Sequence, residues 1–277
     1  MTELQKVEYS LLCEFIRVCE ALKIRYYLVC GTALGAVKYG GFIPWDDDVD
    51  VALTREDYTV FCEKAPQLLP EYVFLQNYKT DPNFPAFYSK LRDSRTTYIE
   101  KSVKNIDMNH GVYIDVFPLD GYPVDENEIK RLESRKRKLK LRLSCAFAFN
   151  EKQSLKSKLY FCVERLLGYH KRTAKTAEKI EKLISAYPIA ESKLWCNHGN
   201  WQRVLEYAPR EQYGEGTFAK FEDLKVRVPE MYDEYLTQKY GDWRSDIPQE
   251  EQVGHHYYEI CDTGTPYASY IANKSQG

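Results

Sequence analysis

The stretch Gly40-Gly41-Phe42-Ile43-Pro44-Trp45-Asp46-Asp47-Asp48-Val49-Asp50-Val51 holds the densest chemical signal in this chain. Residues 48–53 alternate polar and apolar side chains, which predicts a half-buried strand. Because strand side chains alternate between two faces, Asp48 and Asp50 should project together, and Asp46 with them if the strand begins by that residue. Carboxylates gathered in a partly desolvated site repel each other unless a cation lies among them. A set of ligands that consists of oxygen atoms, with no His or Cys among them, favours the binding of Mg²⁺ or Mn²⁺ over that of zinc. The alternative is a solvated acidic loop.

A glycine-rich segment precedes the acidic stretch. Residues 26–30 predict a short strand, and Gly31-Thr32-Ala33-Leu34-Gly35-Ala36-Val37-Lys38 follows it and should open a short helix. Backbone N–H groups at such a turn can hold phosphate oxygens, although glycine after a strand is also common in ordinary turns. Beside an acidic strand, the turn predicts a phosphate cradle facing a metal site, as phosphoryl or nucleotidyl transfer requires.

Further candidates lie downstream. Asp115 stands in a strongly apolar strand, so it either pairs with a Lys or Arg or joins the other carboxylates as metal ligand or general base. Lys90 and Arg92 alternate on a strand and share a face, where they could grip phosphates or simply be solvated. Lys38 and His255 are weaker candidates for the same binding role.

The order of predicted elements indicates a mixed α/β (α+β) fold. Helices are expected over residues 4–23, from Thr54 to about Ala65, and from Pro229 to Tyr240. Strands are expected over residues 72–76, 86–92, 96–100 and 112–117, the last stopped by Pro118. Residues 125–186 are helix-forming throughout. We therefore expect one catalytic domain, a mixed sheet with flanking helices over residues 1–277, with a helical insertion at about 125–190.

Composition excludes several classes of protein. The chain has 277 residues and a formal charge of -2, so it is neither disordered nor, as a whole, a polyanion binder. Its eight scattered cysteines predict free thiols in a reducing compartment, and no signal peptide or transmembrane stretch is evident, which favours the cytoplasm.

Residues 130–142 hold eight Lys or Arg and one Glu. This run could contact the inner face of a membrane or form a solvated helix face; no nucleic-acid motif accompanies it.

Four blocks of this sequence resemble the LicD family of bacterial phosphocholine transferases, which are related to fukutin and the fukutin-related protein. The blocks are residues 30–50, Lys90-Leu91-Arg92-Asp93-Ser94, residues 111–121, and Tyr240-Gly241-Asp242 with Gly254-His255-His256. The resemblance implies a nucleotidyltransferase-like fold. It also implies transfer of phosphocholine from CDP-choline to a sugar hydroxyl of a cell-surface glycan or teichoic acid precursor, with release of CMP; the fukutin-like relatives use CDP-ribitol.

The resemblance assigns roles to the candidate residues. The metal, Mg²⁺ or Mn²⁺, would be held by Asp46, Asp48, Asp50 and Asp115, and the last three of these would carry the chemistry. From the glycine-rich turn and the basic and histidine side chains themselves, we further expect the donor to be bound by Gly31, Thr32, Gly35, Lys38, Lys90, Arg92 and His255.

Three rival functions remain open at this stage. The first is a true nucleotidyltransferase that moves NMP from an NTP to a small hydroxylated acceptor. The second is a non-catalytic scaffold that binds a glycan or nucleotide. The third is a peripheral membrane adaptor that works through residues 130–142.

Overall fold

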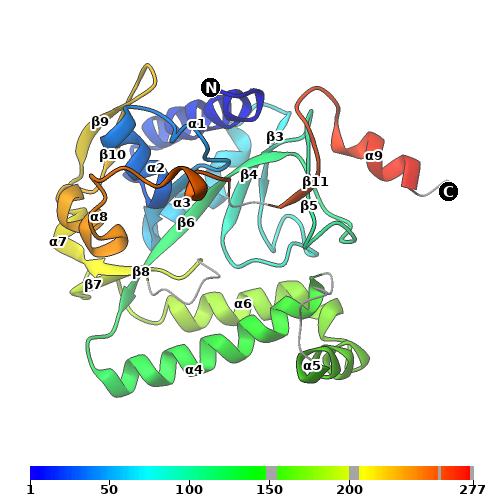
Figure 1. The fold of residues 1–277 in the computed structure, drawn as a ribbon. Coiled ribbons are helices and arrows are strands. Elements are labelled where there is room, and N and C mark those ends of the chain that lie inside the picture. Colours follow the sequence, from blue (N-terminus) through cyan, green and yellow to red (C-terminus); the bar gives the residue numbers. More distant parts are fainter. Residues whose placement is uncertain (148–154, 200–205, 255–256, 275–277) are drawn as a thin grey trace.

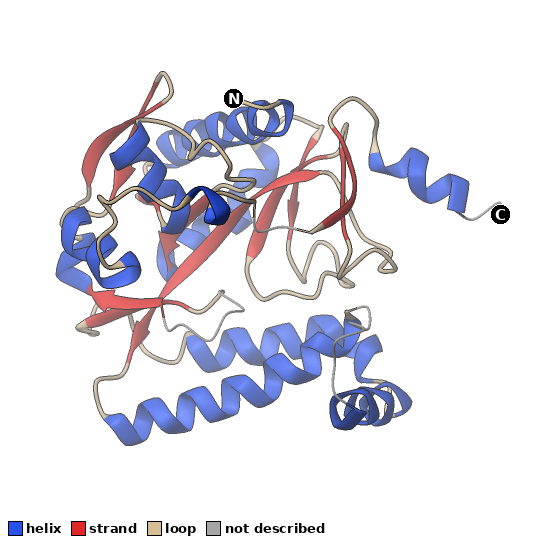
Figure 2. Ribbon diagram, in the orientation of Figure 1, coloured by secondary structure: helices blue, strands red, loops and turns tan. Residues whose placement is uncertain are grey.

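The computed structural model describes residues 1–147, 155–199, 206–254 and 257–274 (Figures 1 and 2). A mixed sheet runs through the centre, with strand order β1-β2-β6-β4-β3; β7 pairs with β6, and β8 with β7. These strands are β1 (Tyr26–Leu28), β2 (Asp50–Thr54), β3 (Val73–Gln76), β4 (Ser89–Asp93), β6 (Val112–Tyr122), β7 (Leu194–Asn197) and β8 (Glu206–Pro209). Two small antiparallel sheets pair β5 (Thr97–Glu100) with β11 (Tyr258–Asp262), and β9 (Thr217–Phe221) with β10 (Leu224–Val228).

Helices flank the sheet on its sides and below it in Figure 1. The α-helices are α1 (Glu3–Leu22), α2 (Cys30–Leu34), α3 (Arg55–Lys64), α4 (Glu126–Leu143), α5 (Leu155–Leu166), α6 (Thr173–Ile184), α7 (Arg210–Tyr213), α8 (Tyr232–Tyr240) and α9 (Tyr267–Lys274). One π-helix, η1 (Gly35–Tyr39), continues α2. Short 3₁₀ turns are η2 (Ala65–Gln67), η3 (Ser144–Ala146), η4 (Tyr169–Arg172) and η5 (Gln249–Glu251).

Helix α1 packs its apolar face on the sheet. Thr2 and Gln5 form a capping box at its start, and Lys23 ends it in the left-handed conformation. Leu11, Leu12 and Phe15 recur at helical spacing and are almost fully buried in the main core. The sequence prediction of a helix over residues 4–23 is therefore confirmed.

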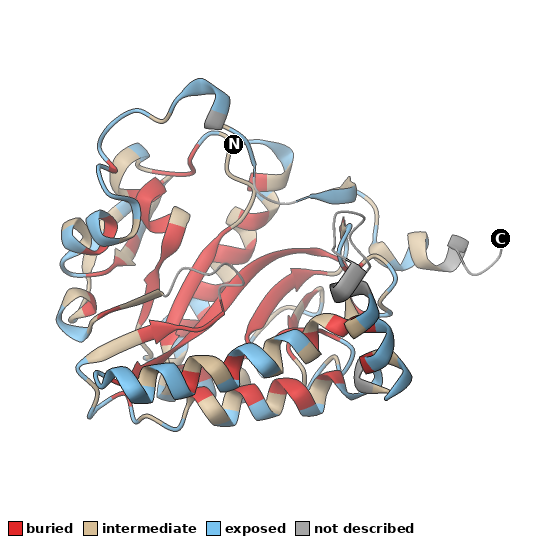
Figure 3. Cartoon of the chain, turned by 60° about the horizontal axis from the view of Figure 1, so that its bottom comes forward, coloured by how far each residue is buried: buried red, intermediate tan, exposed pale blue. Residues whose placement is uncertain are grey.

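Strand β6 is the central member of the sheet and is buried along its whole length (Figure 3). It pairs in parallel with β2 and antiparallel with β4 and β7. The prediction that Pro118 stops this strand is wrong. Pro118 lies opposite Leu53 of β2, and the strand then continues along β7, so the missing N–H of proline costs only one ladder bond.

Two other predicted boundaries also shift. Strand β2 begins at Asp50 and not at residue 48, because the preceding residues turn: the Asp46 N–H donates to the Ile43 carbonyl. The side chain of Gln5 donates to the carbonyls of Ile43 and Asp46, which fixes this turn under α1. Helix α8 begins at Tyr232 and not at Pro229, and its end at Gly241, which has φ +66°, is as expected.

In its described part, the helix-forming region 125–186 is confirmed as α4, α5 and α6; residues 148–154 of this region lie outside the described residues. Helices α4 and α6 pack on each other through Leu143 and Ile180, and the same cluster includes Phe87, which lies just before β4. An ion-pair network also ties α6 to the sheet: the Arg55 guanidinium donates to both carboxylate oxygens of Asp120 in β6, at 2.7 and 2.6 Å, and to Glu181 of α6 at 2.8 Å. Whether this region is an insertion into one domain stays a prediction.

All eight cysteines have free thiols, in keeping with the prediction of free cysteines. Within the described residues, no helix combines the length and apolar character needed to cross a bilayer.

Replacing Arg55 by Ala should lower the free energy of unfolding by about 3–5 kcal/mol, because the almost fully buried Asp120 carboxylate would lose its counter-charge. The matched control is Lys182→Ala, which breaks the exposed Lys182–Glu178 pair and should leave the free energy of unfolding almost unchanged. Urea unfolding of both variants measures the difference. Equal losses would contradict a structural role for the Arg55 network.

Candidate active site

Three polar side chains form a row across adjacent strands. In the parallel pair, Asp50 of β2 lies opposite Asp115 of β6, and Asp115 in turn lies opposite Lys90 of β4. Residues in register point to the same face of a sheet, so the three side chains stand together. The Lys90 ammonium lies 3.2 Å from Asp115 Oδ1 and 3.1 Å from the centre of the Tyr113 ring. The sequence predicted that Asp115 either pairs with a basic side chain or lies beside the other carboxylates. In the structure it does both: it pairs with Lys90 and lies opposite Asp50.

The acidic turn brings more carboxylates to this row. Burial, followed by the charges of Asp48 and Asp115, raises the pKa of Asp50 well above its ordinary value. Burial, followed by Asp48 and Asp47, raises the pKa of Asp46 to about 8. The four predicted ligands, Asp46, Asp48, Asp50 and Asp115, thus share one poorly solvated environment, although Asp46 closes a turn and Asp48 lies in the segment between this turn and β2.

The glycine-rich turn lies directly against the acidic segment. The Thr32 hydroxyl accepts the Asp50 N–H at 2.8 Å, and the Val29 N–H donates to the Asp50 carbonyl. A Cβ at Gly31 would lie 3.0 Å from Asp46 Oδ2, and one at Gly35 would lie 2.6 Å from the Gly41 carbonyl oxygen. The glycines therefore allow the two segments to approach closely. Their role in binding phosphate stays a prediction.

The other predicted donor-binding residues lie in different surroundings. Arg92 is fully buried and shares the face of Lys90, since both contact the Tyr113 ring, but its guanidinium donates to Gln76 Oε1 and the Gly111 carbonyl. Lys38 donates to the carbonyls of Trp243 and Ser245 and so ties η1 to the segment after α8. His255 lies outside the described residues.

Two acidic residues near the site were missed by the sequence analysis. Glu8 of α1 is 2% exposed, and its Oε2 has no hydrogen-bond partner among the described residues. Burial, followed by Asp48 and then Asp46, raises the pKa of Glu8 well above its ordinary value, so this carboxyl faces the acidic turn. A signal was present, because Glu8 is a charged residue that, with the polar Gln5, interrupts the apolar inner face of its helix.

Glu206 of β8 is the second residue that was missed. One carboxylate oxygen pairs with the Lys239 ammonium at 2.6 Å, and the other accepts from the Cys30 thiol at 3.3 Å. The charge of Glu206 also contributes to the raised pKa of Asp50. No sequence pattern marked this residue, since its closeness to Asp50 depends on contacts between segments far apart in the chain.

The donor chemistry of the cluster fits a hard divalent cation. Across the described ranges, no three His, Cys, Asp or Glu side chains converge as they stand in a geometry that would hold a metal ion. However, the cluster offers carboxylate oxygens alone, and Glu8 Oε2 is a buried acceptor with no donor. Carboxylate oxygens are the ligands that Mg²⁺ and Mn²⁺ prefer.

Comparison with known proteins identifies a matching family model and similar proteins. The family model described as LicD/FKTN/FKRP, nucleotidyltransferase domain, matches residues 23–150. The lipopolysaccharide cholinephosphotransferase LicD of Haemophilus influenzae is 31% identical over 269 residues, which cover 94% of this chain and 97% of that protein. The human ribitol 5-phosphate transferase FKRP is 48% identical over 42 residues, or 15% of this chain and 8% of that protein.

The resemblance therefore extends over nearly the whole chain and includes the glycine-rich turn, the acidic turn and strand β6, so the protein is a transferase that belongs to the LicD family.

Proposed function

We propose that the protein transfers a phospho-head group from a CDP-linked donor to a sugar hydroxyl of a cell-surface glycan, such as a lipopolysaccharide or a teichoic acid precursor, and releases CMP. Phosphocholine from CDP-choline is the favoured donor group, because the relative that matches along nearly its whole length is a lipopolysaccharide cholinephosphotransferase. The observation that carries the proposal is the row of Asp50, Asp115 and Lys90, with further carboxylates beside it.

The proposed reaction forms one phosphorus–oxygen bond and breaks another. The acceptor hydroxyl oxygen would bond to the phosphorus of the head group, the phosphorus–oxygen bond to CMP would break, and the hydroxyl proton would pass to a carboxylate of the cluster. A bound Mg²⁺ or Mn²⁺ would neutralise charge on the pyrophosphate. Asp46, Asp48, Asp50 and Asp115 would hold that cation. Lys90, within the row, would lie beside the donor phosphates.

Release of CMP tests this proposal directly. CDP-choline, CDP-ribitol and CDP-glycerol should be compared with and without EDTA, and an NTP arm should monitor pyrophosphate. We expect CMP from one donor, dependent on Mg²⁺ or Mn²⁺, and a loss of at least about 100-fold in Asp50→Asn, because a charged ligand is removed from the site of charge development. The matched control is Asp107→Asn, which alters an exposed carboxylate outside the cluster and should retain activity.

The stability of Asp50→Asn separates a catalytic loss from misfolding. Removal of a buried, repelled charge should leave the metal-free variant at least as stable as the wild-type protein. Pyrophosphate release from an NTP without CMP release from any CDP compound would instead identify a nucleotidyltransferase. Full activity of Asp50→Asn would contradict catalysis by the cluster.

The raised pKa of Asp46 predicts how metal binding depends on pH. Since its ordinary value is 3.8 and the folded value is about 8, the folded protein keeps a proton that the unfolded chain has released between these two pH values. The free energy of unfolding of the metal-free protein should therefore fall as pH rises through this window. Metal binding requires the deprotonated carboxylate, so the rise in Tm produced by Mg²⁺ should be larger at about pH 8 than at about pH 6.

Thermal unfolding with Mg²⁺ and with EDTA at the two pH values measures this effect. The Asp46→Asn variant should show a smaller dependence on pH. A metal-induced rise in Tm that is the same at both pH values would contradict the prediction.

A further inference from the structure

Helix α5 exposes an apolar stripe. Leu159 is 68% exposed, Val163 47%, Leu166 88% and Leu167 57%. Leu159, Val163 and Leu166 are spaced four and three residues apart and so share one face of α5, and Leu167 directly follows the helix. Single exposed leucines are common on protein surfaces, but several exposed on one helical face and at its end form a patch of the kind that marks an interaction site. The Arg165 side chain, by contrast, turns inward and donates to the carbonyls of Cys145 and Phe147.

Helix α4 exposes positive charge. Its exposed basic side chains are Lys130, Arg131, Arg135, Arg137 and Lys138. In the part of α4 after Glu128, the one acidic residue is Glu133, whose carboxylate is half-buried and pairs with Lys136 at 2.6 Å. Beyond its acidic first turn, where Glu126 pairs with Lys130 at 3.4 Å, the exposed face of this helix therefore carries a net positive charge.

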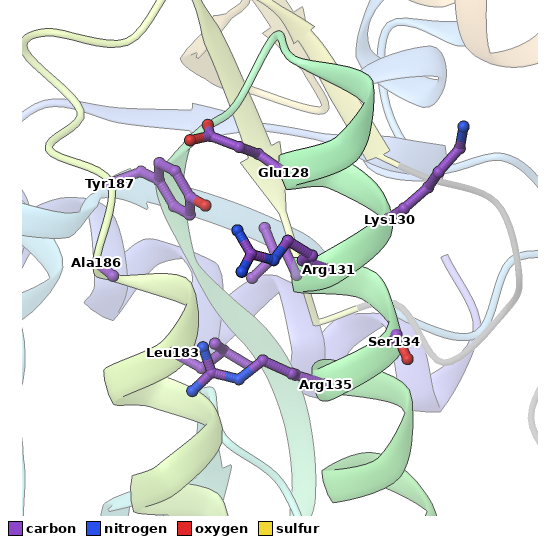
Figure 4. Close-up of a pocket in the computed structure, with 9 residues that line it drawn as sticks. Glu128, Lys130, Arg131, Ser134, Arg135, Leu183, Ala186 and Tyr187 are labelled. Atoms are coloured by element: carbon purple, nitrogen blue, oxygen red, sulfur yellow. The ribbon is translucent and has the colours of Figure 1, made fainter.

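A cavity opens on this basic face. It has a volume of about 690 Å³ and lies between α4 and the C-terminal end of α6. Figure 4 shows the guanidinium groups of Arg131 and Arg135, one helical turn apart, extending from α4 over the cavity toward Leu183 and Tyr187. Two guanidinium groups one helical turn apart, beside Leu183 and Tyr187, suit an anionic group, such as a phosphate, attached to an apolar body, and the Glu128 carboxylate, which also lines the cavity, offsets part of their charge.

The stripe and the cavity belong to one layer of the molecule. Figures 1 and 3 show α4 and α6 side by side beneath the sheet, with α5 beyond the C-terminal end of α4. Helix α5 contacts η3, which directly follows α4. The cavity lies toward the N-terminal end of α4 and the stripe lies beyond its C-terminal end, so the two features are spread along the same layer.

We propose that this helical layer docks on an anionic lipid bilayer. The α5 stripe would enter the boundary between headgroups and acyl chains, while the α4 face would lie against lipid phosphates, with Arg131 and Arg135 holding one of them. Apolar insertion and electrostatic attraction together give stable surface binding where either alone is marginal. A second copy of the chain could cover the stripe, but it would bring the same basic face and leave this charge without a counterpart. The inference does not depend on the proposed function.

Co-sedimentation with vesicles tests the proposal. The wild-type protein should bind vesicles that contain phosphatidylglycerol, should bind pure phosphatidylcholine vesicles at least about tenfold more weakly, and should be released by salt at about 1 M, where the Debye length is about 3 Å. The double variant Leu159→Ser with Leu166→Ser should lose at least about tenfold in partitioning, as should Arg131→Glu with Arg135→Glu.

Each variant has a matched control remote from this layer. Phe218→Ser changes an apolar side chain on β9 that is 51% exposed, and Lys64→Glu with Lys101→Glu makes the same change in net charge elsewhere on the surface. Both controls should bind vesicles like the wild-type protein. Because all these side chains are exposed, every variant should keep the wild-type Tm.

Three results would overturn the proposal. They are no binding to anionic vesicles, equal binding to phosphatidylcholine, and wild-type binding by either double variant. If vesicle binding is absent and sedimentation velocity shows a wild-type dimer that Leu159→Ser with Leu166→Ser converts to a monomer, the stripe is a self-association surface.

Discussion

The parallel pairing of β2 with β6 is the constraint on which the rest of the site depends. It sets Asp50 opposite Asp115, and the antiparallel pairing of β4 adds Lys90 to the same row. A shift of register by one residue would turn the side chains of one strand to the opposite face. The burial of β6 along its whole length prevents such a shift, because its apolar side chains are held in the core. The fold therefore positions the carboxylates through hydrophobic packing and not through contacts among the carboxylates themselves.

The carboxylates are costly to the fold that positions them. Burial and mutual repulsion raise the pKa values of Asp46, Asp50 and Glu8, so each destabilises the metal-free protein when ionised. Lys90 offsets part of this charge at Asp115, and Lys239 offsets that of Glu206. A protein that keeps such a cluster in its core gains stability when a cation binds there. Stability and the proposed chemistry are therefore linked through the same side chains.

Local pattern predicted the elements well where a periodic apolar face or a cap defines them, as in α1 and at Thr54, whose hydroxyl accepts the Asp57 N–H. It failed where distant segments decide the outcome. Pro118 stays within a strand because β7 extends the pairing, and Asp46 lies in a turn because the Gln5 side chain holds that turn. Strand alternation correctly set Lys90 and Arg92 on one face, but it could not show that Gln76 and Gly111 enclose the Arg92 guanidinium. Glu206 reaches the site only through tertiary packing.

The central claim is that the carboxylate cluster binds a divalent cation together with the phosphates of a cytidine nucleotide. A crystal structure of the protein with Mn²⁺ and CDP, with anomalous scattering used to locate the metal, tests this claim most directly. The account predicts one or more anomalous peaks ligated by Asp50 and Asp115 and by at least one of Asp46 and Asp48, with the CDP pyrophosphate bound to the metal and adjacent to Lys90. Mn²⁺ and CDP bound elsewhere, with these carboxylates unliganded, would contradict it.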